Sequence, residues 1–254
     1  MRVPRQALAR LASPVVVLAV WQIVSAAGLV SERTVPAPST IADTALELFR
    51  DGTLVEAILT SVQRAGAGFL AGAVAGVGLA LIAGLSRLGE HAVDPIMQML
   101  RALPLFGLIP LFILWFGIGE APKVALVALG VAFPLYLNTF AGIRGVDGKL
   151  AEVAHVLRLS RIGLVFHIVL PGALPQALVG LRQSLGLAWL ALIVAEQINA
   201  SSGLGFMINN AREFLRTDIV VLGLIVYAAL GLLTDAIVRL LERRALTWRK
   251  GFLS

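Results

Sequence analysis

Three residues within one apolar stretch have the types and spacing to bind an anion. Arg182, Trp189 and Glu196 follow one another at seven-residue intervals, which places them near one face of a helix. Arg182 lies roughly 14 Å along that helix, where an unpaired charge is costly in a membrane. An arginine at that depth is suited to pairing with an anionic ligand. The alternatives are a structural ion pair and a side chain that snorkels to the headgroups. Glu196 would repel an anion, so we expect it to pair with an arginine or to hold a gate; Asp235 is expected to pair with Arg239 at i+4.

A second group of residues has the pattern of a docking helix. An apolar stripe forms where residues recur at i, i+3, i+4 and i+7: Leu150, Val153, Ala154 and Leu157. Polar residues step by three and drift around the helix: Lys149, Glu152, His155, Arg158 and Arg161. With Asp147 as N-cap and Gly163 after the stop, the sequence predicts a helix over about 148–160. The stripe is suited to entering a groove on another protein; the alternative is a solvated connector.

Catalytic and metal-binding patterns are missing from the sequence. The chain has no cysteine, which excludes disulfides, thiolate metal sites and cysteine catalysis. His91, His155 and His167 lie at or near expected loops, and no Walker-type loop, zinc-ligand spacing or Ser/His/Asp grouping occurs. We therefore predict a protein that is not an enzyme and that holds no metal and no cofactor of its own.

The composition is that of an integral membrane protein. Hydrophobic residues make up 58% of the chain and charged residues 14%, against roughly 25% charged in soluble domains. Since about 20 helical residues cross a hydrocarbon core, an all-α fold with six transmembrane helices is predicted. The expected spans are residues 11–28, 58–85, 103–118, 124–143, 173–195 and 219–238.

Two of these spans carry further local signals. Pro104 and Pro110 predict that the third span is kinked or partly re-entrant. Small residues recur every four positions in the second span and form a ridge for close helix packing: Gly68, Gly72, Gly76, Ala80 and Gly84. The pattern leaves open whether the ridge contacts a helix of the same chain or a second copy.

The distribution of Lys and Arg predicts the orientation of the chain. Fourteen of them fall on one side, which is therefore assigned to the cytoplasm with both termini: Arg2, Arg5, Arg10, Arg87, Arg101, Arg144, Lys149, Arg158, Arg161, Arg239, Arg243, Arg244, Arg249 and Lys250. Five fall on the other: Arg33, Arg50, Lys123, Arg212 and Arg216. The net charge of +6 thus reflects topology and gives no support for nucleic-acid binding. A cleaved signal peptide over residues 1–27 is the alternative for the first span.

The segment around the docking helix resembles the EAA loop of ATP-binding-cassette importer permeases. The resemblance is carried by Glu152, Ala154, Gly163 in the turn region, and Leu170-Pro171 at the exit. One position departs from the pattern: Arg158 stands where the family has a glycine, whose freedom at positive φ an arginine lacks.

Other stretches along nearly the whole chain are similar to the permeases that import aliphatic sulfonates, taurine and nitrate. These stretches are 36–39, 98–104, 109–111, 114–118, 133–139 and 193–196, and residues 209–218 are most similar to the alkanesulfonate member. The resemblance implies one transmembrane permease domain over 1–254, with the type I importer fold and a cytoplasmic coupling helix, in the bacterial inner membrane.

The same resemblance implies a homodimer, two ATPase subunits that bind ATP and Mg, and an extracytoplasmic binding protein. The coupling residues would be Leu150, Glu152, Val153, Ala154, His155, Leu157, Arg158 and Gly163. Arg182, Trp189 and Glu196 would line the translocation path for an organic anion. Aliphatic sulfonates are the expected substrate, with taurine, nitrate or a thiamine precursor as alternatives. A secondary transporter is the alternative class, although no internal repeat supports it.

Overall fold

The computed structural model describes residues 5–31 and 34–247, and for residues 5–11, 151, 153–155 and 199 it describes the backbone only. The predictions that involve Arg2, Arg33, Arg249 and Lys250 lie outside the described residues, as do those for the side chains of Arg5, Arg10, Val153, Ala154 and His155.

The described chain is made of helices and connecting turns, without a strand between residues 5 and 247, apart from the gap at 32–33. The all-α fold predicted from the composition is therefore correct. The elements are α1 (Arg5–Ala26), α2 (Pro38–Arg50), α3 (Thr53–Leu85), α4 (Arg87–Arg101), η1 (Leu105–Leu108), α5 (Ile109–Phe116), α6 (Glu120–Arg144), α7 (Gly148–Val156), α8 (Arg161–Leu164), η2 (Val165–Val169), α9 (Leu170–Asn199), α10 (Leu204–Glu213) and α11 (Thr217–Ala245).

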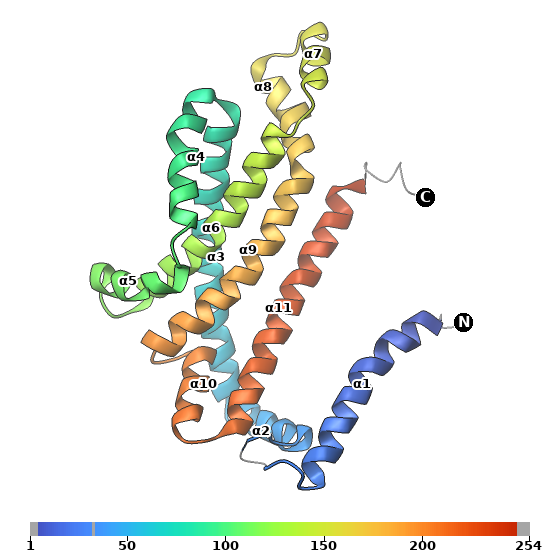
Figure 1. Ribbon diagram of the computed structural model, residues 1–254, viewed down its shortest axis with the longest axis vertical. Helices are drawn as coiled ribbons and strands as arrows, with labels where there is room; N and C mark the ends of the chain where they lie inside the picture. The colour runs from blue at the N-terminus through green and yellow to red at the C-terminus, as the bar shows by residue number, and fades with distance from the viewer. Residues whose placement is uncertain (1–4, 32–33, 248–254) are drawn as a thin grey trace.

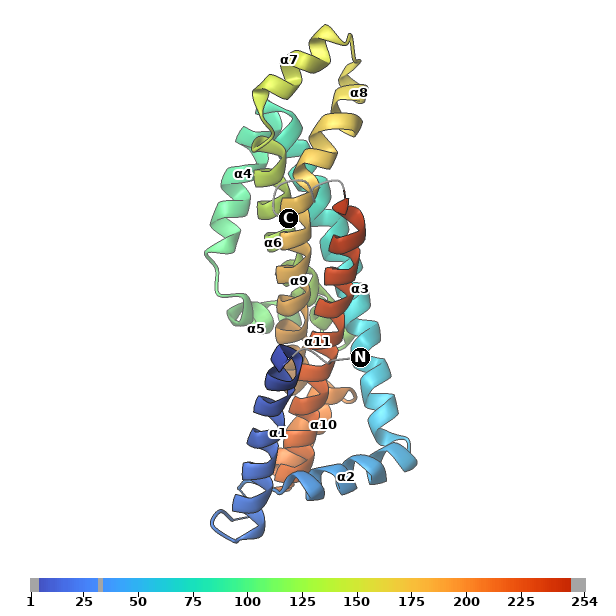
Figure 2. The ribbon, with the colours of Figure 1, turned by 90° about the vertical axis from the view of Figure 1, so that its right-hand side faces the viewer.

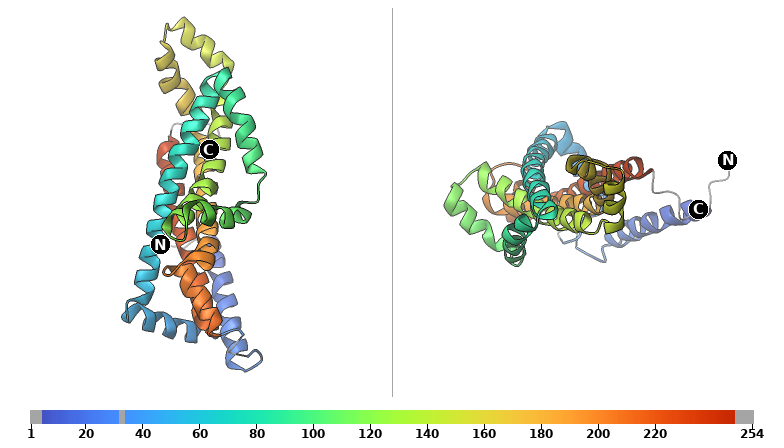
Figure 3. Two further views of the ribbon diagram at one scale, coloured as in Figure 1. Left: turned by 90° about the vertical axis from the view of Figure 1, so that its left-hand side faces the viewer. Right: turned by 90° about the horizontal axis from the view of Figure 1, so that it is seen from above.

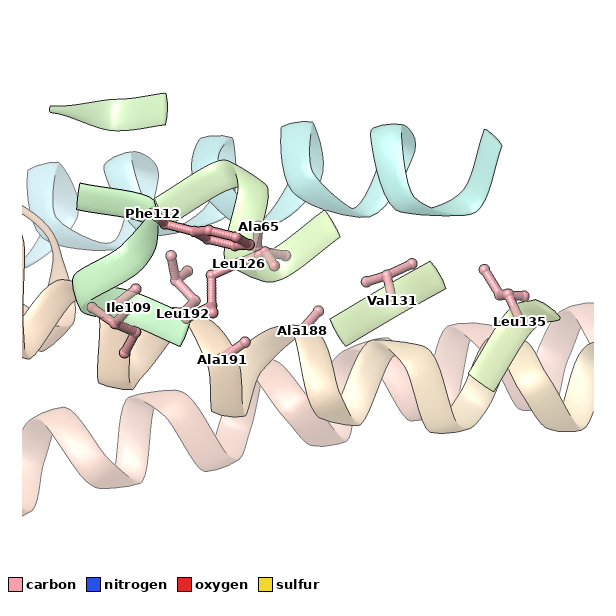
Figure 4. Packing of buried hydrophobic residues seen from close by; sticks show 11 residues of the cluster. Ala65, Ile109, Phe112, Leu126, Val131, Leu135, Ala188, Ala191 and Leu192 are labelled. Carbon is pink, nitrogen blue, oxygen red and sulfur yellow. The ribbon is translucent and has the colours of Figure 1, made fainter. Parts of the chain in front are cut away.

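Helix α6 is the centre of the bundle and packs against α3 on one side and α9 on the other (Figure 1). Its residues Leu126, Val127 and Val131 are almost fully buried. They meet Ala65 of α3, Phe112 of α5, and small residues of α9 such as Ala191, as Figure 4 shows for this cluster. Lipid tails are as apolar as these side chains, so the hydrophobic effect does not favour their burial between helices. They are held here by close packing between the helices.

The glycine ridge of α3 contacts α6 of the same chain, which answers the question that the sequence left open. A Cβ built on Gly68 would lie 2.6 Å from Cβ of Val127, and one on Gly76 would lie 2.6 Å from the carbonyl oxygen of Ala132. Both positions therefore require glycine for the two backbones to come this close.

The molecule is elongated, and its two ends are built from different elements. Helices α7 and α8 form one end, which we call the α7–α8 end, while α2 and α10 lie toward the other, the α2–α10 end (Figures 1 and 2). Helix α1 stands apart from the central helices and contacts α2 (Figure 3). The side chains from Val15 to Val20 are accordingly exposed.

Four helices of the described residues are long and apolar enough to cross a membrane: α3, α6, α11 and the continuous run Arg161–Ile198. The third predicted span, 103–118, differs from the observed structure because it contains only η1 and the eight-residue α5. Instead, α4 and the η1–α5 segment meet at a bend of 92°, as in a broken span or a re-entrant loop, and we call this bent pair the broken span. The predicted kink is confirmed. It follows Arg101, the last residue of α4, so this end of α4 lies near the middle of the long axis (Figure 1) and not on the cytoplasmic side that the charge of Arg101 predicted. The apolar part of α1, Ala12–Ala26, is shorter than the other candidates.

Candidate functional site

The segment predicted to dock on a partner forms α7, at the extreme of the α7–α8 end (Figure 1). Asp147 caps it as expected, since its Oδ1 accepts from the backbone N–H of Lys149 at 2.9 Å. The helix ends at Val156, four residues before the predicted end at Ser160. Arg158 has φ 54°, the left-handed conformation that terminates helices and that glycine adopts most easily. Arginine therefore takes up the geometry for which the family pattern has glycine.

The chain after this turn is also more helical than the sequence indicated. Ser160 is the N-cap of α8, and its Oγ accepts from the backbone N–H of Gly163 at 3.1 Å. Gly163 therefore lies in the first turn of a helix and not in the turn region. Likewise Leu170-Pro171, expected as an exit, lies inside a continuous run that passes from α8 through the π-helical η2 into α9. Pro171 has no backbone N–H to donate, and the wider π-helical turn of η2 directly precedes it.

Apolar side chains are exposed around α7 and its turn. The exposed fractions are 46% for Leu150, 81% for Val156 and 65% for Leu157, and Ile162 in α8 is 71% exposed. Glu152 and Arg158 are exposed beside them. The docking role of these residues remains a prediction. It requires an exposed apolar surface, which these side chains form.

Arg182, Trp189 and Glu196 do share one face of α9, as their spacing predicts, but that face packs on α11. Arg182 pairs with Glu242 at 2.6 Å and with Asp235 at 3.3 Å. Trp189 donates to Thr234 Oγ1 at 3.3 Å. Asp235 also pairs with Arg239 at 2.7 Å, as the i+4 spacing predicts. The stripe is thus a seam between two helices of one chain, but the Arg182 side chain is 43% exposed and lines a pocket with Arg239 and Glu242. That these residues line the path remains a prediction.

Glu196 is the centre of a buried polar network and is only 1% exposed. Its carboxylate accepts from the guanidinium of Arg64 at 2.7 Å and from the hydroxyl of Tyr227 at 2.8 Å. Ser61 Oγ donates to it at 2.8 Å, and so does the backbone N–H of Gly205. The expectation that Glu196 pairs with an arginine is confirmed.

Arg64 extends this network to α6. Its guanidinium binds both carboxylate oxygens of Glu120, and its Nη1 donates to the carbonyl oxygen of Ser202 at 2.6 Å. Lys123 adds a 2.9 Å contact to Glu120. Five helices, α3, α6, α9, α10 and α11, are therefore joined at one place. Sequence reasoning missed Arg64 and Glu120 as a pair, although a basic residue near or inside an apolar span could have signalled it.

A smaller group ties α2 to the start of α11. Thr44 Oγ1 donates to Asp218 Oδ2 at 2.9 Å, and Arg216 Nη2 donates to the same oxygen at 2.8 Å. The pKa of Arg216 is raised, mainly because its guanidinium forms this hydrogen bond to a carboxylate. Helix α2 is thereby fixed to the start of α11.

Comparison with known proteins gives consistent matches. The family model "Binding-protein-dependent transport system inner membrane component" matches residues 72–247. The putative aliphatic sulfonates transport permease proteins of Bacillus subtilis and Escherichia coli are 48% and 49% identical, over 94% of this chain and 87% and 91% of theirs. The taurine transport system permease protein of Escherichia coli is 34% identical over 96% of this chain and 90% of its own.

Solved structures agree with the fold. A crystal structure of an amino acid ABC transporter with histidines superposes with a TM-score of 0.65 at 16% identity, covering 79% of this chain and 97% of that one. The MetNI methionine ABC transporter, in an inward-facing conformation, gives a TM-score of 0.59 at 18% identity, with 74% and 95% coverage.

Proposed function

This chain belongs to the inner membrane components of binding-protein-dependent transport systems, which are permease subunits of ATP-binding-cassette transporters and not enzymes, and we propose that it imports aliphatic sulfonates. Its partners are an ATPase and a binding protein, as membership of such a system implies. ATP and Mg are held by the ATPase subunits, and this chain supplies the route through the membrane.

The observation that carries the proposal is the difference in identity between relatives. Two permeases named for aliphatic sulfonates are 48% and 49% identical to this chain, whereas a taurine permease is 34% and a nitrate permease 30% identical. All four cover most of the chain, so the difference is not an effect of match length.

The test is uptake by proteoliposomes that contain the chain, its ATPase and its binding protein. We expect ATP-dependent accumulation of a six-carbon alkanesulfonate, with unlabelled taurine and nitrate competing weakly. Accumulation of taurine or nitrate in preference to the alkanesulfonate would overturn the substrate assignment. Accumulation without ATP would instead indicate a secondary transporter.

We further propose that α7 and its turn are the coupling helix that docks on the ATPase. The support is the exposed Leu150, Val156 and Leu157 at the tip of the molecule, where they are separated from the apolar core. An apolar stripe surrounded by charges fits a groove on a soluble protein. With α7 on the ATPase, the α7–α8 end is cytoplasmic, and we propose this orientation for both termini.

The docking proposal is tested by co-purification. Glu152→Arg reverses a charge beside the stripe and is expected to reduce the ATPase recovered with the permease. Asp43→Arg, an equal change at an exposed position in α2 near the opposite end, is the matched control. Normal ATPase recovery with Glu152→Arg, or an equal loss with Asp43→Arg, would contradict the assignment.

We also propose that two copies of the chain form the path together. Within one copy the predicted stripe packs along a single neighbouring helix, α11, and its Arg182 end is 43% exposed, so a second copy is needed to enclose it. Chemical cross-linking of the detergent-solubilised complex is expected to give a dimer of the chain with two ATPases, and a single copy per complex would contradict this proposal.

A further inference from the structure

A pocket of about 390 Å³ lies where the broken span meets the central helices. It is lined by the turn after α4, the start of η1, and the middle of α6 and α9. Its wall is mostly apolar, with Phe106, Phe133, Leu137 and Leu187 contributing, and only two polar side chains of the described residues, Arg101 and Gln183, reach it. The volume is within the roughly 300–1,000 Å³ of pockets that hold small organic molecules.

Arg101 provides an unneutralised positive charge at this pocket. It is exposed, and no described carboxylate lies within ion-pairing distance of its guanidinium. The neighbouring acid on α4, Asp94, is engaged by the hydroxyl of Tyr136 at 3.0 Å. By contrast, Arg64, Arg144 and Arg182 on the long helices each have a carboxylate partner. The α4–α5 turn lies near the middle of the long axis (Figure 1), where an unpaired charge is costly unless it faces water or an anion.

Gln183 offers hydrogen-bond donors at the same pocket. Its Oε1 accepts from Nδ2 of Asn138 at 3.0 Å, and its Nε2 has no acceptor among the described residues. The carbonyl side of this amide is therefore occupied and the amide N–H groups are available. A guanidinium and an amide donor are the groups that bind sulfonate oxygens, because both present N–H groups to an anion.

A line of amides leads from the pocket toward the α7–α8 end. Gln176 Nε2 donates to Asn138 Oδ1 at 2.9 Å, and Asn138 in turn donates to Gln183. Gln176 and Gln183 are seven residues apart on α9, so they share a face, and both are exposed. Two exposed amides and the half-buried Asn138 in apolar spans are unfavourable against lipid tails and favourable along a path that contains water.

We propose that the pocket at Arg101 and Gln183 is the substrate site within the membrane, and that it holds an alkanesulfonate. Arg101 and the Gln183 amide bind the sulfonate oxygens, and the phenylalanine and leucine side chains contact the alkyl chain. The Asn138 and Gln176 amides continue the path toward the ATPase. This inference rests on the sulfonate import proposed above, and it places the path on a different side of α9, about 100° around the helix from the seam with α11.

The proposal is tested by uptake of the six-carbon alkanesulfonate at low concentration in the proteoliposomes described above. Arg101→Gln, which replaces the charged guanidinium with a neutral amide, is expected to lower uptake about tenfold or more. Gln183→Glu, which places a carboxylate against the anion, is expected to lower it by a similar factor. Arg87→Gln at the start of α4 and Gln63→Glu on α3 are matched exposed controls outside the pocket and are expected to keep wild-type uptake.

Co-purification with the ATPase shows that each variant assembles. Should Arg101→Gln fail to assemble, Gln183→Glu and its control decide the question. Wild-type uptake by an assembled pocket variant would overturn the site while leaving sulfonate import intact. Absence of alkanesulfonate uptake by the wild-type complex would instead overturn the proposed function. A loss that is equal in the pocket variants and their controls also overturns the site.

Discussion

The two ends of the molecule satisfy their polar and apolar groups in opposite ways. Toward the α2–α10 end, the Glu196 carboxylate has Arg64, Ser61, Tyr227 and the Gly205 N–H as partners, all within the chain. At the α7–α8 end, apolar side chains such as Val156 and Leu157 are exposed. The first end thus pairs its buried charges within the chain, although Phe214 and Leu215 just after α10 are 73% and 80% exposed. The second end shows no comparable buried network among the described residues and exposes apolar side chains that another protein or lipid could cover.

This difference indicates how movement could pass through the molecule. A network that joins five helices resists separation of those helices, since each buried charge would lose its partner. The exposed turn at Arg158 has few such constraints. A force applied at α7 would therefore act through α9 on a firmly held opposite end, in the manner of a rigid-body tilt.

The largest expected effect on stability is at the polar network of Glu196, toward the α2–α10 end. Glu196→Ala leaves the Arg64 guanidinium buried with one carboxylate partner fewer, and it removes the acceptor of Ser61 and Tyr227. We expect a loss of about 3–5 kcal/mol in stability, measured by thermal unfolding in detergent. Glu213→Ala, at an exposed carboxylate of α10, is the control. Equal unfolding temperatures for the two variants would show that the network does not hold this end.

A smaller effect tests the packing between the ends. A Cβ on Gly72 would overlap the carbonyl oxygen of Ala128 and lie 2.8 Å from Cβ of Val131, so Gly72→Ala must separate α3 from α6. The expected cost is about 1–3 kcal/mol. Gly78→Ala on the same helix meets nothing within 4 Å and is expected to be neutral or slightly stabilising. Similar unfolding temperatures for both alanine variants would mean that the close approach is dispensable.

At the α7–α8 end we expect a substitution to leave stability unchanged and to weaken the contact with the ATPase. Leu157→Asp is expected to leave thermal unfolding almost unchanged, within about 0.5 kcal/mol, because Leu157 is 65% exposed. It should nevertheless reduce the amount of ATPase that co-purifies. Asp43→Arg again serves as the control for charge changes at an exposed helix. A large drop in unfolding temperature with full ATPase recovery would remove the distinction between the two ends.

A small effect on stability, with none expected on ATPase recovery, concerns two strained positions, one at each end. Arg158 and Leu215 are the non-glycine residues of the described chain with positive φ, at 54° and 58°. Because glycine adopts this conformation without steric cost, Arg158→Gly and Leu215→Gly should each be stabilising or neutral, by at most about 1 kcal/mol. Thermal unfolding measures both, and Arg158→Ala, which keeps the Cβ, is the control. Destabilisation by Arg158→Gly beyond that of Arg158→Ala would contradict the assigned backbone strain.

Much of the fold could be predicted from local patterns. Long apolar runs predicted spans over 58–85 and 219–238, which lie inside the helices Thr53–Leu85 and Thr217–Ala245, and Pro104 and Pro110 indicated a break in the span that contains them. The α4 helix was missed because its charged first turn resembles a loop, although α4 continues into the broken span. The end of α7 was placed four residues late, since no propensity marks Arg158 as left-handed.

The sequence by itself determined a helical membrane protein, its family pattern and the close-packing ridge, because periodicity and composition are properties of one segment at a time. Only the tertiary structure decided which helix each side chain meets. It paired Glu196 with Arg64, placed Arg182 against α11, and left Arg101 beside an apolar pocket. Spacing along a helix fixes a face but not the neighbour of that face, and the neighbour decides whether a charge is neutralised or available to a ligand.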